Sequence, residues 1–114
     1  MERQDLYEKL KTLNWQQKLG NLASTLATIS TRSPISKYDK LTSHLLLEAA
    51  LIIEWCAAEV PEDFLWELAT MQRELMEWKK VFPVEEVRNL LALIARMRSD
   101  RILQMAGMLS EGDN

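Results

Sequence analysis

The segment FLWELATMQRELMEWKKVF, residues 64–82, carries the clearest structural signal in the chain. Its large apolar residues recur at alternating steps of four and three positions: Phe64, Leu68, Met71, Leu75, Trp78 and Phe82. This spacing puts them on one face of an α-helix, as in helices that pack lengthwise against a neighbour. The sequence therefore predicts a helix here and a fold built from packed helices.

Prolines mark the start of this helix and of the next one. In VPEDF (60–64) and FPVEEV (82–87), Pro61 and Pro83 are each followed by acidic residues. Proline is favoured in the first turn of a helix, where its missing N–H is not needed, and acidic groups there are stabilised by the helix dipole. We expect one helix to start at Pro61 and another at Pro83, with short connections that imply antiparallel neighbours or sharp corners.

Two helical stripes near the start of the chain do not share one phase. The first consists of Leu6, Leu10 and Leu13, and the second of Trp15, Leu19, Leu22, Leu26 and Ile29. Asn14 followed by Gln17 is a capping-box pattern, which is typical of a helix N-terminus. Either a short helix ends near Leu13 and a new one starts at Trp15, or one helix is kinked or broken there. We favour one long element with a kink or break.

The second helix is expected to be the most buried. Pro34 in STRSPISK (30–37) marks a loop, and Ser36 with Asp39 suggests a second capping box, so we expect this helix to run from about residue 37 to 59. Most of its side chains are Leu, Ile, Ala or Cys. Five of its polar residues share a sector of roughly 100° of the helix: Lys37, Lys40, His44, Glu48 and Glu59. Glu54 lies outside this sector.

These patterns predict an all-α, compact four-helix bundle-like domain, with a fifth short helix if the first element is split. The 114 residues fit a single domain spanning 1–114, and the polar end, 110–114, is expected to be frayed. The last helix is expected to bury an apolar stripe of Val87, Leu90, Leu91, Ile94 and Met97.

The composition argues against several classes of function. The single cysteine, Cys56, cannot form an internal disulfide or a multi-cysteine zinc motif. We find no catalytic constellation, and we expect no enzymatic activity and no cofactor. Three Glu in the helix 37–59 oppose a membrane span. Charged residues throughout the first twenty positions lead us to expect a cytoplasmic protein.

His44 and Glu48 raise the question of a metal or ligand site. They are four residues apart on one helix, so both side chains could reach the same ion. However, His44 is the only histidine in the chain, and the pair lacks the order and spacing of a carboxylate-bridged metal site. A metal or ligand carrier around these two residues is therefore the third of our functional alternatives, and we assign no metal ligand.

Glu54 lies among apolar residues, away from the polar edge of its helix. An unpaired carboxylate buried there would be costly. Arg98 and Arg101 present the same problem in the apolar sector of the last helix. We therefore hypothesise a buried ion pair between Glu54 and one of these two arginines, with an exposed Glu54 as the alternative.

The segment LGNLASTLATIST (19–31) has no charged residue. Its outer face is small and neutral, which would allow a close approach by another helix. We expect an interaction surface made of this face and of two tryptophans that lie off the core stripes as anchors: Gly20, Asn21, Ser24, Thr28, Trp55 and Trp66. Cover by another helix of the same chain is the alternative.

We therefore expect a small cytoplasmic protein-interaction or regulatory module, either binding another protein or self-associating as a homodimer. The alternative is a nucleic-acid-associated regulator that uses basic residues of the last helix and those just before it: Lys79, Lys80, Arg88, Arg96, Arg98 and Arg101. The formal net charge of −3 makes nucleic acid the less favoured partner, and no membrane association is expected.

Overall fold

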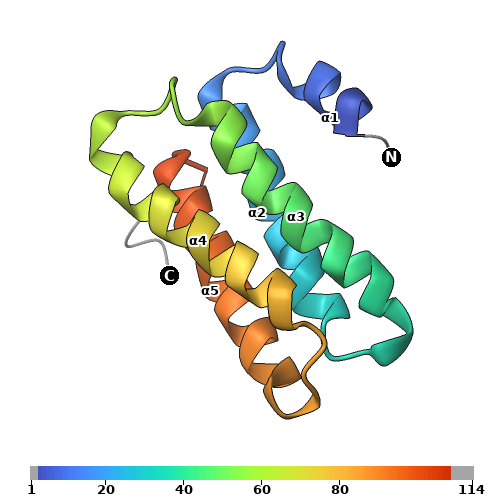
Figure 1. Ribbon diagram of the computed structural model, residues 1–114. Helices are drawn as coiled ribbons and strands as arrows, with labels where there is room; N and C mark the ends of the chain where they lie inside the picture. The colour runs from blue at the N-terminus through green and yellow to red at the C-terminus, as the bar shows by residue number, and fades with distance from the viewer. Residues whose placement is uncertain (1–2, 109–114) are drawn as a thin grey trace.

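The structure is a computed structural model that describes residues 3–108, and within this range helices are the only regular secondary structure (Figure 1). The all-α prediction is confirmed. Five α-helices are joined by turns: α1 (Arg3–Leu10), α2 (Trp15–Arg32), α3 (Asp39–Cys56), α4 (Leu65–Val81) and α5 (Arg88–Met105). Short 3-10 turns precede three of them: η1 (Ser36–Tyr38), η2 (Glu62–Phe64) and η3 (Glu85–Val87). The predicted frayed end, 110–114, lies outside the described residues.

The four long helices alternate in direction and form a bundle, with α1 near the end where α2 begins (Figure 1). α2 lies against both α3 and α5, and α3 lies against α4. α4 and α5 are farther apart and meet mainly through side chains. The bundle is therefore tightly packed around α2 and more open along the α4–α5 side.

α3 is, as predicted, the helix with the most buried residues in the part of the chain that is described. They are Thr42, Leu46, Ala49, Ala50, Ile52, Ile53 and Cys56. Its solvent-facing side is wider than the predicted polar edge, because Leu41 and Glu54 are exposed and Leu47 and Leu51 are only half-buried. The predicted stripe of α4 faces the core through Leu68, Met71 and Leu75.

The capping box at Asn14 is present and separates α1 from α2. The Asn14 Oδ1 atom accepts a hydrogen bond from the Gln17 backbone N–H at 2.8 Å, and Gln17 Oε1 accepts one from the Asn14 N–H at 3.0 Å. Our preference for one long first element was wrong, since this cap starts a new helix. Capping pairs act locally, so the sequence contained the signal for this boundary, although we favoured the other interpretation.

The other predicted helix starts are displaced by the 3-10 turns. Pro61 immediately precedes η2, so α4 begins at Leu65, and α5 begins at Arg88 rather than at Pro83. The predicted Ser36–Asp39 capping box is wrong, because Ser36 opens η1 and no side chain caps η1 or α3. The Asp39 carboxylate binds Arg88 instead.

The buried Arg88 side chain joins three segments at one end of the bundle. Its guanidinium donates two hydrogen bonds to the Asp39 carboxylate, at 2.7 and 2.9 Å. It also donates to the Ser33 carbonyl oxygen at 3.0 Å and to Glu85 Oε2 at 2.8 Å. A buried guanidinium is tolerated when its donors are satisfied in this way. The Arg88 hydrogen bonds hold the pKa of the Asp39 carboxyl below its usual value.

The Asn14 cap predicts a defined loss of stability. Asn14→Ala leaves the N–H of Gln17 without its acceptor, and we expect the free energy of unfolding to fall by about 1 kcal/mol. Urea unfolding followed by far-ultraviolet circular dichroism measures this change. Ser24→Ala, at an exposed position of the same helix, is the control and should not reduce stability. Equal midpoints for Asn14→Ala and the unmodified chain would contradict the role of the cap.

The Asp39–Arg88 pair predicts a pH-dependent contribution to stability. Because the folded-state pKa of Asp39 is lowered, its contribution is complete above the unfolded-state value and is lost as the pH falls through the folded-state pKa. Asp39→Asn should therefore lower the urea midpoint at pH 7. The midpoints of Asp39→Asn and the unmodified chain should converge as the pH falls through the folded-state pKa of Asp39, which lies below its usual value. A difference that stays constant with pH would rule out this ion pair as its source.

Candidate functional site

Three large apolar side chains on α5 point into solvent. Leu90 is 49% exposed, Leu93 58% and Met97 55%, and their spacing of three and four puts them on one helix face. The prediction that the last helix buries Leu90 and Met97 is wrong. The face that α5 turns inward contains Leu91 and Ile102 together with the small residues Ala95 and Ser99.

Small residues on α5 explain this orientation. The Ser99 hydroxyl donates a hydrogen bond to the Ala23 carbonyl oxygen of α2 at 2.8 Å, and the Ser30 hydroxyl of α2 donates to the Ala92 carbonyl oxygen at 2.7 Å. Both bonds require the helices to approach closely, which large side chains between them would prevent. Ala92, Ala95 and Ser99 were the sequence signal for this contact, and the apolar stripe predicted for α5 did not include them.

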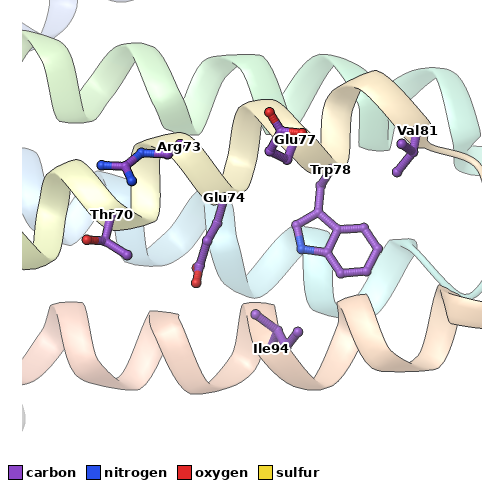
Figure 2. A pocket seen from close by; sticks show the side chains of 7 residues that line it. All are labelled: Thr70, Arg73, Glu74, Glu77, Trp78, Val81 and Ile94. Atoms are coloured by element: carbon purple, nitrogen blue, oxygen red, sulfur yellow. The ribbon is translucent and has the colours of Figure 1, made fainter.

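A hollow of about 490 Å³ lies beside these residues, between α4 and α5. Figure 2 shows its lining: Thr70, Arg73, Glu74, Glu77, Trp78 and Val81 of α4, and Ile94 of α5. The Trp78 ring extends from α4 toward α5, with Ile94 on the opposite side. We call the apolar residues of the hollow, together with the exposed residues of α5, the α4–α5 face: Trp78, Val81, Leu90, Leu93, Ile94 and Met97.

Trp66 protrudes from α4 close to this hollow. It is 76% exposed, more than any other large apolar residue in the described part of the chain. It lies four residues before Thr70, whose side chain lines the hollow, so the two residues are neighbours on one side of α4. Trp66, one of the two expected anchors, is thus exposed to solvent.

The predicted ion pair of Glu54 with Arg98 or Arg101 is wrong. Arg98 binds Glu74 through two hydrogen bonds, at 3.1 and 2.9 Å, and Arg101 binds Glu67 at 2.8 and 3.0 Å. Both acids belong to α4. Glu54 is exposed on α3, and it had no need of a buried partner. The two arginines therefore bridge the gap between α4 and α5.

The six residues expected to form one interaction surface lie on three helices. Gly20, Asn21 and Ser24 line a shallow hollow of about 410 Å³ on α2, and Met108 covers part of it by packing against Gly20. Thr28 is half-buried on the same helix, and its hydroxyl donates to the Ser24 carbonyl oxygen at 3.0 Å rather than to another helix. The neutral face of α2 thus uses its own backbone as its hydrogen-bond partner.

Trp55 is half-buried and makes contacts within the chain. It is packed against the core, and its ring meets that of Tyr7 in α1 edge to face, with centroids 5.3 Å apart. Trp55 therefore helps to hold α1 against the bundle. Sequence periodicity placed Trp55 on the polar edge of its helix but could not show that α1 covers it.

Several of the residues named for the alternative functions are engaged in ion pairs. Three of the arginines expected to form a basic patch, Arg88, Arg98 and Arg101, are bound to acidic side chains. His44 is exposed, and within residues 3–108 no group of three or more His, Cys, Asp and Glu side chains could hold a metal ion. None of the helices in this range is long and apolar enough to cross a membrane.

The Cys56 thiol is buried in the core, and burial raises its pKa to about 11. Only the thiolate is strongly nucleophilic, so almost none of the reactive form is present near pH 8. We expect an aromatic disulfide reagent to modify Cys56 at least about a hundredfold more slowly in the native protein than in denaturant. The absorbance of the released thiolate measures both rates. Comparable rates would show that the thiol is accessible.

Comparisons of the chain with protein-family models, with curated proteins and with solved structures found no match. The functional assignment therefore depends on the geometry of the α4–α5 face.

Proposed function

We propose that this chain is a cytoplasmic protein-binding module without catalytic activity, and that the α4–α5 face is its binding surface. The observation that carries this proposal is the exposure of Leu90, Leu93 and Met97 beside an apolar hollow. Single exposed apolar side chains are common on protein surfaces. A contiguous group of them next to a concave surface marks an interaction site.

The residue types of the face suit a protein partner. Trp78 forms one wall of the hollow, and aromatic residues and methionine are enriched at protein interfaces. Met97 has a flexible, polarizable side chain that adapts to the shape of a partner. Closing the face with apolar side chains of another protein would remove Leu90, Leu93 and Val81 from water, which favours association.

Three of the polar side chains that line the hollow, those of Thr70, Glu74 and Glu77, are engaged in structural contacts, which supports binding rather than catalysis. Glu74 is bound by Arg98, and Glu77 lies 3.2 Å from the Lys80 ammonium. The Thr70 hydroxyl donates to the Trp66 carbonyl oxygen at 3.0 Å. Among the described residues that line the hollow, no general base lies beside a nucleophile, as acyl or phosphoryl transfer would need.

Site-specific photocrosslinking tests the proposal whatever the identity of the partner. A photoreactive amino acid replaces Leu93 in the full chain, which is produced in the cells in which the protein naturally occurs. Irradiation should give a covalent adduct of defined mass, because Leu93 lies at the centre of the exposed stripe on α5. A second substitution, Val81→Glu, places a charge in the hollow and should reduce the yield at least about tenfold.

The matched control carries the photoreactive residue at Leu41, an exposed leucine on α3. The Val81→Glu substitution should not change the yield of any adduct formed at Leu41. Adducts of equal yield at Leu41 and Leu93 would indicate nonspecific capture. The absence of any adduct at Leu90, Leu93 and Met97 would contradict the proposed function.

A further inference from the structure

We infer that the α4–α5 face binds a second copy of the chain, in an antiparallel two-fold dimer in which each Trp66 packs over the hollow of its partner. This inference rests on the proposed function of that face. Trp66 lies four residues before Thr70 and seven before Arg73, and both of these residues line the hollow. Residues at those spacings share one side of a helix. The protruding indole and the hollow therefore belong to one continuous surface.

Trp66 and the hollow are placed symmetrically along α4. Trp66 lies eight residues before Glu74, and Val81 lies seven residues after it. At about 1.5 Å per residue these separations are about 12 and 10.5 Å. We place a two-fold axis in the interface plane, at right angles to α4 and near Glu74. The two α4 helices of the dimer are then antiparallel. This arrangement places each Trp66 over the partner's Val81 and Trp78, which are otherwise exposed or half-buried.

Charged side chains at the centre of the surface are complementary under the same symmetry. Arg73 and Glu77 both line the hollow, one helical turn apart, so the axis brings each Arg73 close to the partner's Glu77. Arg73 is exposed, and its side chain has no ion-pair partner within residues 3–108. Within the described part of the chain, the one ion-pair partner of Glu77 is the exposed Lys80 of its own helix. The dimer supplies the ion-pair partner that Arg73 lacks among the described residues of its own chain.

The size of the surface is sufficient for a specific dimer. α4 has 17 residues, a length of about 25 Å, and α4 with α5 is about 20 Å wide. Each copy therefore offers about 500 Å², and the dimer would bury about 1,000 Å² in total, at the lower limit for specific interfaces. The predicted dimer is thus one that dissociates on dilution.

Sedimentation equilibrium of the purified full chain tests this inference. We expect a mass near 26 kDa, twice the 13.2 kDa of one chain, which decreases at low concentration. Trp66→Ala removes the anchor and should raise the dissociation constant about thirtyfold or more. Met76→Ala is the matched control, because Met76 is an exposed apolar residue of α4 that does not line the hollow. It should leave the dissociation constant unchanged.

Charge-reversal variants show whether Arg73 and Glu77 interact between two chains or within one chain. Arg73→Glu alone places like charges opposite each other in its homodimer, and so does Glu77→Arg alone, so each variant should be monomeric. In an equimolar mixture, the Arg73→Glu and Glu77→Arg chains can form a heterodimer. Each of its two contacts then joins residues of opposite charge. The mixture should therefore form dimers that neither variant forms by itself.

A monomer at all concentrations would overturn the inference, as would a dimer that Trp66→Ala does not weaken or a mixture that stays monomeric. These failures differ from a failure of the proposed function. A monomeric chain whose Leu93 crosslinks to a different protein removes only the self-association. A monomeric chain without any adduct at the α4–α5 face contradicts both.

Discussion

The close contact between α2 and α5 determines how the rest of the bundle is arranged. The Ser30 and Ser99 hydroxyls cross this contact to backbone carbonyl oxygens of the opposite helix, at 2.7 and 2.8 Å. Such bonds form only where small side chains line the interface, so α5 presents Ala95 and its neighbours to α2. The larger side chains of α5 are consequently turned away from α2. The packing requirement of one helix pair thus produces the apolar surface on the other side of α5.

The separation of α4 from α5 is the second result of this arrangement. Since α5 is held near α2 and α4 near α3, longer side chains must span the remaining distance. Arg98 and Arg101 do so by binding Glu74 and Glu67 across the gap. These pairs are more than a third exposed and contribute little stability each. Their effect on the geometry is larger, because they fix the distance between α4 and α5. At this distance the hollow beside Trp78 remains open.

Local signals in the sequence were sufficient for the helices but not for their orientation. The Asn14 cap and the stripe of α4 each depend on a few residues within one helix. The all-α fold could therefore be predicted, and the signal for the boundary between α1 and α2 was present, although we favoured one long element. In α5, by contrast, apolar residues occupy both the buried and the exposed side. Periodicity cannot tell which side meets a neighbour, and Leu90 and Met97 were misplaced for this reason. The ion-pair partner of Arg98 was mispredicted for the same reason, because it depends on which helix lies opposite α5.

The two ends of the bundle are held by different contacts. One end therefore opens locally at a lower free energy than the other. At one end, Arg88 ties three segments together through a single buried side chain. At the other end, α1 has eight residues and is held mainly by Leu6, Leu10 and the ring contact of Tyr7. A helix this short is not stable in isolation, so α1 is helical only while it is docked. Amide hydrogens of α1 therefore exchange through a local, low-energy opening, whereas opening the other end requires the hydrogen bonds of the buried Arg88 side chain to break.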